Sequence, residues 1–214
     1  MARTDLKKTL QSTKNNPSIG GEQQIKALVL NGSESGASAV NPVSDYLVDF
    51  LRIKGIEVDV IVLRDEKIAG CLGCFGCWLR TPGECVINDA GRDLPRKVMQ
   101  SDLVFLLTPV TFGMYSYQLK KAFDRIPCPL LLPFFANING EIHHAERYGN
   151  YPSFVAIGVL PNPDEECEGT FTALVGRNGI NLHASNISSI IYSTDNPDAI
   201  KEKVKTTLSK AGVR

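Results

Sequence analysis

Five short apolar runs, separated by helical patterns, constrain the fold of this chain more than any other feature of its sequence. The runs are apolar throughout rather than alternating, which is typical of strands buried on both faces of a parallel sheet. Such a sheet needs helices on both sides, and the segments between the runs supply them. The runs are IKALVLNG (25–32), IEVDVIVL (56–63), SDLVFLLTPV (101–110), SFVAIGVL (153–160) and ISSIIYS (187–193).

The helices are indicated by apolar residues at helical spacing and by residues that begin or end helices. Asn41 and Pro42 begin the first helix and Gly55 ends it, while Asn196 and Pro197 begin the last one. The order of these elements predicts an α/β domain with a doubly wound, five-stranded parallel sheet and helices on both faces. The other helical patterns cover residues 91–100, 115–126 and 165–180.

One domain accounts for residues 25–214, whereas residues 1–24 are polar and are predicted to form an arm, either mobile or packed on a second subunit. The chain has 23 basic and 23 acidic residues, which gives no electrostatic argument for binding nucleic acid or an anionic membrane. No apolar run reaches about 18 residues, and the first residues lack the apolar core of a signal peptide, so we expect a cytoplasmic protein without a membrane partner.

The carboxyl ends of the strands mark the edge where open parallel sheets bind ligands. The segments NGSESGAS, TPVTFGMYS and GVLPNPDEE follow the first, third and fourth strands and therefore meet at this edge. The long connection 64–92, which follows the second strand, begins there as well. We therefore expect the functional site at this edge.

The segment NGSESGAS, after the first strand, places small residues and hydroxyls just before a helix. Small residues let backbone amides turn toward a ligand, and hydroxyls together with the positive end of a helix favour phosphate. An ordinary strand-to-helix turn has the same composition, and the segment matches neither the P-loop nor G-x-G-x-x-G, so both interpretations stay open. Glu34 disfavours phosphate unless its carboxylate points to solvent.

The segment TPVTFGMYS, after the third strand, mixes a proline with aromatic residues. It is suited to an apolar wall with backbone donors and acceptors beside a planar ring system. The alternative is a turn whose aromatic residues belong to the core.

Four cysteines follow the second strand in the pattern C-x2-C-x2-C-x7-C. Clustered cysteines in a reducing cytosol more often bind metal or take part in catalysis than form disulfides. Structural zinc sites usually use two separated C-x2-C pairs, whereas this spacing is closer to the cysteine run of bacterial ferredoxins, which holds a [4Fe–4S] cluster. Metal-free thiols that pack as small apolar residues are the alternative, and Cys128 and Cys167 are predicted to be structural. The motif consists of Cys71, Cys74, Cys77 and Cys85.

These segments together resemble the flavodoxin-like NAD(P)H-dependent FMN reductases, a group that includes the iron–sulfur flavoproteins. The resemblance rests on LVLNGSESGAS, GCLGCFGCWLRTPGECVIND and SDLVFLLTPVTFGMYSYQLKKAFDRI, and it spans residues 25–195. It implies a flavodoxin-like sheet with strand order 2-1-3-4-5, FMN as the bound cofactor, NAD(P)H as electron donor and a homodimer or homotetramer. It also makes the four-cysteine motif a candidate ligand set for a [4Fe–4S] cluster.

By the same resemblance, the first loop would hold the phosphate of FMN and the loop after the third strand would lie along its ring system. The family's first loop often reads S-P-R or S-x-R, but no Lys or Arg lies between Ala27 and Leu51 here. We therefore expect FMN to be held without a strong ion pair. The implied cofactor-binding residues are Ser33, Ser35, Gly36, Ser38, Pro109, Val110, Thr111, Phe112, Gly113 and Gly158.

FMN itself accepts a hydride and releases electrons in pairs or singly, so no side chain is nominated as catalytic. The leading prediction is an oxidoreductase that passes electrons from NAD(P)H to a quinone, a nitro compound, a metal ion or a protein. The alternative is an iron–sulfur flavoprotein that carries single electrons through a [4Fe–4S] cluster. A third interpretation is a structural module whose cysteines hold zinc.

The connection 127–152 is apolar at first and then polar. Its apolar half is a candidate subunit interface. His144, Arg147 and Tyr148 are candidates for contact with nicotinamide or substrate, and a solvated loop is the alternative. Neither His143 nor His144 fits a zinc-ligand spacing.

Overall fold

A computed structural model describes residues 24–36, 38–193 and 197–210. The predicted arm lies outside this part of the chain except for Gln24, as does the predicted helix-starting residue Asn196. None of the helices in the described ranges is both long and apolar enough to cross a membrane.

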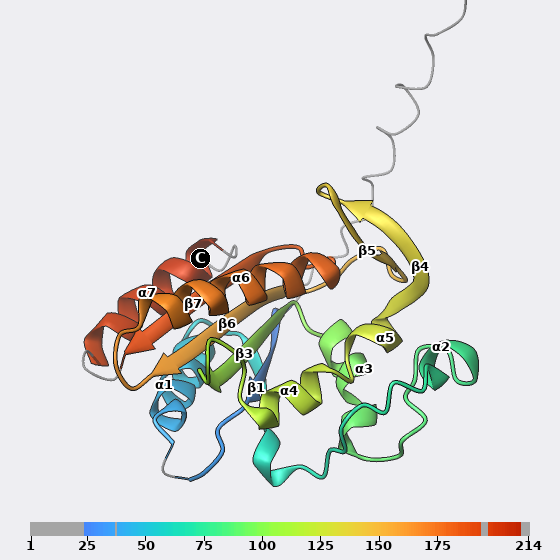
Figure 1. Cartoon of the computed structure of the whole chain (residues 1–214). Helices are drawn as coiled ribbons and strands as arrows, with labels where there is room; N and C mark the ends of the chain where they lie inside the picture. The colour runs from blue at the N-terminus through green and yellow to red at the C-terminus, as the bar shows by residue number, and fades with distance from the viewer. Residues whose placement is uncertain (1–23, 37, 194–196, 211–214) are drawn as a thin grey trace, which may run out of the picture.

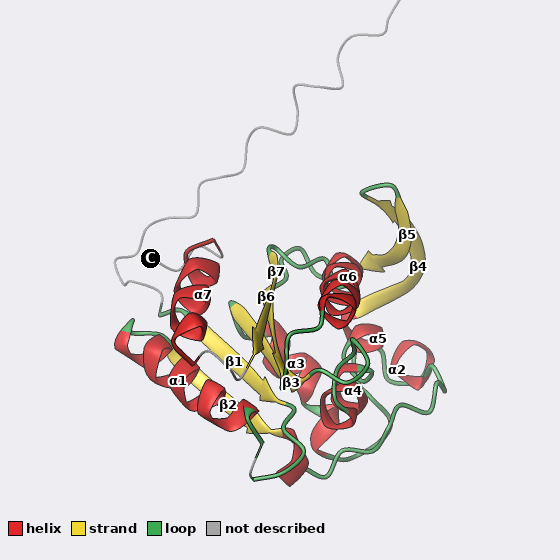
Figure 2. Cartoon of the chain, turned by 60° about the vertical axis from the view of Figure 1, so that its left-hand side comes forward, coloured by secondary structure: helices red, strands yellow, loops and turns green. Residues whose placement is uncertain are grey.

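The five expected strands form one sheet in which every pair is parallel, and their spatial order confirms the predicted 2-1-3-4-5 arrangement (Figures 1 and 2). The first and third strands are neighbours at the centre, so the loops that follow them emerge side by side. The order is β2-β1-β3-β6-β7, with bounds β1 Lys26–Asn31, β2 Glu57–Val62, β3 Leu103–Pro109, β6 Ser153–Leu160 and β7 Ile187–Ser193.

Helices cover both faces of the sheet, as the uniformly apolar strands require (Figure 2). One core packs α1 (Val40–Ile53) and α7 (Pro197–Lys210) against residues such as Val29 and Phe105. The other packs the remaining large helices against the side chains that alternate with these, such as Leu30 and Leu106. These helices are α3 Leu94–Met99, α4 Tyr117–Phe123 and α6 Glu165–Asn181.

A β-hairpin in the connection 127–152 was not predicted from the sequence. After the short helix α5 (Pro127–Leu130), β4 (Leu131–Ile138) and β5 (Glu141–Glu146) pair as antiparallel strands outside the main sheet. Asn139 and Gly140 form the turn with φ of 52° and 87°. Asn-Gly is a strong hairpin signal, because both central residues of a type I′ turn need positive φ.

The connection 64–92 contains little regular structure and crosses the molecule. It begins with the 3₁₀ helix η1 (Leu63–Asp65), which contacts α4, and continues through the four-residue helix α2 (Gly76–Leu79). It then returns through the 3₁₀ helix η2 (Ala90–Arg92) into α3. The predicted short helix after residue 90 is therefore confirmed, and α2 adds a turn of helix inside the cysteine motif.

Candidate functional site

The first loop is fastened to its neighbours where β1 ends. The amide of Gly32 donates to the carbonyl of Leu107 (2.7 Å), and the hydroxyl of Ser116 donates to the carbonyl of Gly32 (2.6 Å). A Cβ at residue 32 would lie only 2.8 Å from Cβ of Leu119. Only glycine fits this position, so β3 and α4 fix the direction in which the first loop leaves the sheet.

The serines predicted to hold phosphate lie in this loop at different depths. Ser33 is buried, Ser35 and Gly36 are exposed, and Ser38 is half-buried. Glu34 is exposed, which meets the condition under which the loop tolerates an anion. The binding role of these residues stays a prediction.

Side-chain amides hold the first loop against the start of α1. Asn31 accepts a hydrogen bond from the amide of Ser33 (2.9 Å), and Asn41 donates to the carbonyl of Gly36 (2.8 Å). No acidic residue lies in the first turn of α1, a 14-residue helix. The positive end of the helix dipole therefore faces the loop without a competing carboxylate.

A cation that sequence reasoning missed completes this part of the site. Nη1 of Arg64 donates to the hydroxyl of Ser33 and lies 3.5 Å from Oδ1 of Asn41. The first loop has no Lys or Arg of its own, and the positive charge beside it comes from the end of β2. The signal was the strand register: Asn31 pairs with Val62, so residues just beyond both strands lie close together. The expectation that FMN is held without a strong ion pair stays a prediction.

The loop after β3 forms a tight turn that presents Phe112. Thr111 and Met114 exchange both backbone hydrogen bonds (3.0 and 2.9 Å), and φ is positive at Phe112 (50°) and Gly113 (72°). The Phe112 side chain is 92% exposed. A phenylalanine in the left-handed region is unusual, and such residues cluster at functional sites. The turn therefore offers an aromatic face at the same edge as the first loop.

The aromatic residues of this segment divide between the two interpretations left open above. Tyr115 is buried and packs against Phe123 and Phe171, so the core interpretation holds for it. Phe112 and Met114 are exposed and fit the interpretation of a wall for a ligand. Of the other predicted residues, Pro109 is half-buried, Val110 and Gly113 are buried, and Thr111 is exposed.

Gly158 lies near the carboxyl end of β6, beside the start of the loop after β3. A Cβ at this position would lie 2.6 Å from Cγ2 of Val110 and 3.1 Å from the ring of Phe171. Packing alone therefore requires glycine here. Its predicted place beside a flavin stays a prediction.

The cysteine motif does not lie with these loops. Tyr151, just before β6, donates its hydroxyl to the carbonyl of Leu130 (2.8 Å), which places α5 at the amino-terminal side of the sheet. Helix α2 packs on α5, and Nε1 of Trp78 donates to the carbonyl of Leu131 (2.9 Å). Figures 1 and 2 both show α2 beside α5 and the base of β4. Only the start of the connection 64–92 is at the expected edge.

The thiols share one neighbourhood, which also includes a cysteine predicted to stand apart. Cys128 on α5 lies within hydrogen-bonding reach of Cys77 on α2 and near Cys71 and Cys74. Burial, followed by the neighbouring thiols, raises the pKa of Cys128 to about 12. Cys85 is buried and Cys71 and Cys74 are exposed. Within the described ranges, no three His, Cys, Asp or Glu side chains are arranged to hold a metal ion.

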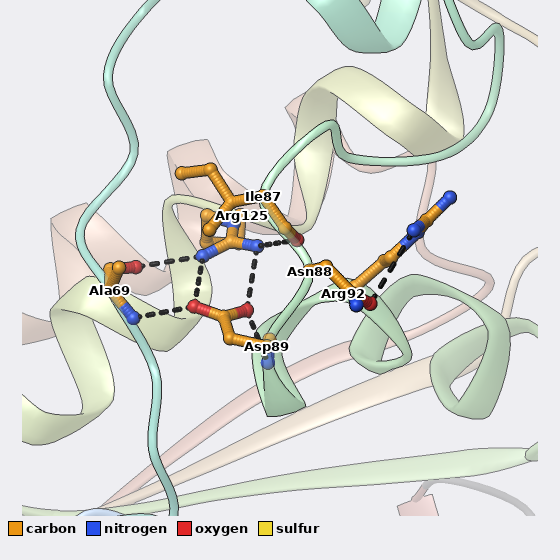
Figure 3. Close-up of polar contacts among 7 residues, drawn as sticks. Ala69, Ile87, Asn88, Asp89, Arg92 and Arg125 are labelled. Carbon is orange, nitrogen blue, oxygen red and sulfur yellow. Dashed lines mark hydrogen bonds and ion pairs between the residues drawn. The ribbon is translucent and has the colours of Figure 1, made fainter.

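A buried ion pair fastens both ends of the cysteine loop to the end of α4 (Figure 3). The guanidinium of Arg125, whose side chain is fully buried, donates to both carboxylate oxygens of Asp89 at 3.1 and 2.9 Å. It also donates to the carbonyls of Ala69 (2.8 Å) and Ile87 (3.3 Å), which lie on opposite sides of the cysteine motif. Cys85 lies against the same guanidinium.

Asp89 accepts further hydrogen bonds from the backbone beside this ion pair. Its carboxylate accepts from the amides of Ala69 (2.7 Å) and Gly91 (3.0 Å). Burial by itself would raise the pKa of Asp89, but the hydrogen bonds from Arg125 and these amides outweigh it and hold the pKa below its usual value. Sequence reasoning missed Asp89, because the residues next to it in the sequence do not indicate that its partner, Arg125, lies 36 residues away.

The polar residues of the hairpin region lie on the amino-terminal side as well. The ring of His144 lies between the rings of Trp78 and Phe135, at centroid distances of 5.0 and 5.2 Å. Arg147 donates to the carbonyl of Leu131 (3.2 Å), and His143 lies 3.0 Å from a carboxylate oxygen of Glu141. Within one chain these residues support the hairpin, away from the edge that carries the first loop.

Comparison with known proteins connects these features to one family. A family model described as NADPH-dependent FMN reductase matches residues 25–148, more than half of the 214 residues. An iron-sulfur flavoprotein of Archaeoglobus fulgidus is 32% identical over 156 residues, which cover 73% of this chain and 64% of that protein. An iron-sulfur flavoprotein of Methanocaldococcus jannaschii is 38% identical over 101 residues, which cover 47% of this chain and 51% of that protein.

These matched stretches span less than two thirds of either relative. Among solved structures, an NAD(P)H:quinone oxidoreductase from Methanothermobacter marburgensis is similar with a TM-score of 0.65 at 14% identity. The match covers 90% of this chain and 99% of that one, and it shows a shared fold.

Proposed function

Because the chain belongs to the NADPH-dependent FMN reductase family, we propose that it is an oxidoreductase that uses FMN to move electrons from NAD(P)H to an acceptor. The acceptor classes are a quinone, a nitro compound, a metal ion or a protein. The observation that carries the proposal is the meeting of the first loop with the exposed Phe112 turn at one edge of the sheet.

The polar end of this edge fits a phosphate. Ser33, Ser35 and Ser38 supply hydroxyls, and the start of α1 supplies a positive dipole end without a nearby carboxylate in its first turn. Glu34 is exposed. These groups would bind the phosphate of FMN and thereby fix the cofactor's position on the sheet.

The other end of the edge fits a planar ring system. Phe112 and Met114 offer exposed apolar surface. Gly113 between them packs so closely on Thr170 that a Cβ added at residue 113 would lie 2.6 Å from Cβ of Thr170. This arrangement would orient the ring and shield part of it from water.

When bound, FMN supplies the chemistry, accepting a hydride from a nicotinamide and releasing electrons in pairs or singly. The residues of the chain need only bind and orient the reactants in turn. No side-chain acid or base is assigned.

The visible spectrum of the full chain, purified without oxygen, tests this function. We expect two resolved flavin bands that bleach when NADPH is added, and the same titration with NADH shows which nicotinamide is used. A chain that binds no flavin after FMN is added would contradict the proposal. Retained flavin that neither nicotinamide reduces would leave FMN binding intact and remove the reductase activity.

A second candidate is an iron–sulfur flavoprotein that carries single electrons. It is supported by the C-x2-C-x2-C-x7-C spacing and by the two relatives from Archaeoglobus fulgidus and Methanocaldococcus jannaschii, which are both iron-sulfur flavoproteins by name. The observed side chains of Cys71, Cys74, Cys77 and Cys85 share a neighbourhood but are not arranged as a ligand set. They do not fit a [4Fe–4S] cluster in this arrangement, so no electron-transfer step through one is derived.

Metal analysis of the anaerobically purified chain separates the two candidates. A cluster predicts about four iron atoms and four sulfides per chain and a broad brown shoulder beneath the flavin bands. Stoichiometric zinc favours the structural module, and protein without metal favours thiols. Replacing a cysteine of the motif, as in Cys74→Ser, should lower the metal content if the motif holds the metal. Cys167→Ser is the matched control and should leave the metal content unchanged, since Cys167 lies on α6, outside the motif.

We also propose that the chain forms a homodimer or homotetramer through the hairpin. Phe134, Phe135 and Ile142 are 64%, 74% and 67% exposed there, and clustered apolar surface favours association. Light scattering of the wild type and of Phe135→Asp tests this, and a monomeric wild type would contradict it. The cytoplasmic localisation and the formation of an arm by residues 1–24 stay predictions.

A further inference from the structure

Arg64 reaches the first loop from a neighbouring strand. β1 and β2 are in register up to Asn31 and Val62, so the chain leaves the sheet at the same level on both strands. The 3₁₀ helix η1 then turns the chain, with Leu63 fully buried as its anchor. This turn directs the Arg64 side chain back across the end of β1.

The guanidinium of Arg64 is only partly used by the protein. Nη1 donates to Ser33 and weakly to Asn41, and Nε lies 3.5 Å from the carboxylate of Asp65, which is 66% exposed. Among the described residues, Nη2 has no hydrogen-bond or ion-pair partner. The side chain is 23% exposed, so the charge is sheltered by protein and still open to a ligand on the loop.

We propose that Arg64 supplies the positive charge that binds the phosphate of FMN, a charge that no residue between Ala27 and Leu51 provides. A guanidinium presents a planar set of N–H donors that matches phosphate oxygens, and such charge-assisted bonds are stronger than neutral ones. Ser33, which Arg64 already contacts, is the buried hydroxyl of the loop. The inference rests on the proposed function.

Two roles for Arg64 make different predictions. A residue that only supports Ser33 would act through the position of an uncharged hydroxyl, so its removal would leave the salt dependence of the preference for FMN over riboflavin unchanged. A phosphate-binding cation distinguishes FMN from riboflavin, which has the same ring system and no phosphate. The difference between the two affinities is therefore the quantity to measure.

The experiment titrates the full chain, freed of bound flavin, with FMN and with riboflavin, and follows flavin fluorescence. We expect Arg64→Ala to weaken FMN binding by about 10- to 100-fold and to leave riboflavin unchanged. The advantage of FMN over riboflavin should fall with added salt in the wild type and much less in the variant. Circular dichroism and the thermal midpoint verify folding, and Arg64→Gln replaces the alanine variant if that variant does not fold.

Arg52→Ala is the matched control. Arg52 lies in the last turn of α1, at the far end of that helix from the first loop, and lines the same surface hollow beside β2 as Arg64. The Arg52→Ala variant removes one positive charge, as Arg64→Ala does, and should leave the affinities for FMN and riboflavin unchanged. Arg64→Lys keeps the charge without the planar donors and should retain part of the preference for FMN.

Three results would overturn the inference. An Arg64→Ala variant that binds FMN as the wild type does removes Arg64 from the site. An Arg64→Ala variant that keeps the wild type's salt dependence of the FMN preference, or that loses affinity for FMN and riboflavin equally, makes Arg64 a support of the loop alone. If the wild type binds neither flavin, the proposed function fails and the inference fails with it, which separates that result from the first two.

Discussion

At the scale of single residues, Phe112 combines a left-handed backbone with an almost fully exposed ring. The paired backbone hydrogen bonds of Thr111 and Met114 hold this conformation, and residues in the left-handed region cluster at functional sites, which favours a role toward a ligand. We predict that Phe112→Ala weakens FMN and riboflavin alike by about 3- to 10-fold, because the lost stacking involves the ring system. This equal loss contrasts with the FMN-specific loss expected for Arg64→Ala.

The measurement is the same pair of fluorescence titrations, with Phe134→Ala as control. Phe134 is also exposed, at 64%, but it lies on the hairpin at the opposite edge. Unchanged affinity for both flavins in Phe112→Ala would remove Phe112 from the binding site.

The Arg125–Asp89 pair is buried and connects the end of α4 to both ends of the cysteine loop. Removing one partner of a buried pair leaves an uncompensated charge, so we expect Asp89→Asn to lower the free energy of unfolding by about 3–5 kcal/mol. Urea unfolding at neutral pH measures this loss. Asp93→Asn is the control, because its partner Arg96 is 60% exposed and surface pairs contribute only about 0.2–1 kcal/mol.

The same pair predicts a dependence of stability on pH. Although burial opposes it, the net effect of Arg125 and the two amides is a pKa of Asp89 below its usual value. The stabilisation is therefore complete above the unfolded-state pKa of about 3.9 and is lost as the pH falls through the lower folded-state value. Unfolding between pH 7 and pH 3 should show a smaller acid loss in Asp89→Asn than in the wild type, and parallel curves would contradict the assignment.

Residues such as Arg64 and Asp89 mark the limit of prediction from sequence at this scale. The serines and Phe112 were named because they follow strands directly and match a motif. Arg64 and Asp89 act on partners 31 and 36 residues away, and their local sequence carries no signal of this. Strand register would have found Arg64, whereas Asp89 needed the three-dimensional path of its loop.

At the scale of elements, the uniformly apolar strands and the helices between them were predictable because the sheet is buried on both faces. The predicted start of α1 at Asn41 was wrong: the helix begins at Val40 after Ala39, and the Asn41 side chain holds the first loop instead of capping the helix. The hairpin was not predicted, because β4 and β5 lie outside the main core and show no apolar alternation of their own. Its local signal was Asn139-Gly140, whose positive φ values match the turn. The four-residue helix α2 had no signal, since its stability comes from packing on α5.

The hairpin turn makes a prediction at this scale. Gly140 has φ of +87° and open space around its Cα, so Gly140→Ala introduces backbone strain without a clash and should cost about 1 kcal/mol. Hydrogen exchange should show faster opening of the β4 and β5 amides, with the main sheet unaffected. Gly149→Ala, also in open space and without positive φ, is the control. Equal exchange in both variants would mean that the turn does not hold the hairpin.

At the scale of the whole molecule, the candidate flavin site and the cysteine motif lie at opposite ends of the strands of one sheet. The flavin site is at the carboxyl ends, and the cysteine motif is at the amino-terminal side beside α5. Topology rules placed the first loop and the Phe112 turn together, because they follow neighbouring parallel strands. The same rule located only the beginning of the connection 64–92. A long connection is not bound to the edge where it starts, and this one crosses to α5 before it returns.

This separation predicts that the cysteines and the flavin site act independently within one chain. The double variant Cys71→Ser, Cys74→Ser changes two exposed thiols and should leave the FMN dissociation constant unchanged, because the cysteine motif lies beside α5 at the amino-terminal side of the sheet, away from the first loop. Bleaching of the flavin by NADPH should also proceed at the wild-type rate. Fluorescence titration and anaerobic stopped-flow absorbance measure the two quantities. Weaker FMN binding by the folded double variant would show that the cysteine loop contributes to the flavin site, which one chain cannot achieve in the observed arrangement, and would favour a site completed by a second copy.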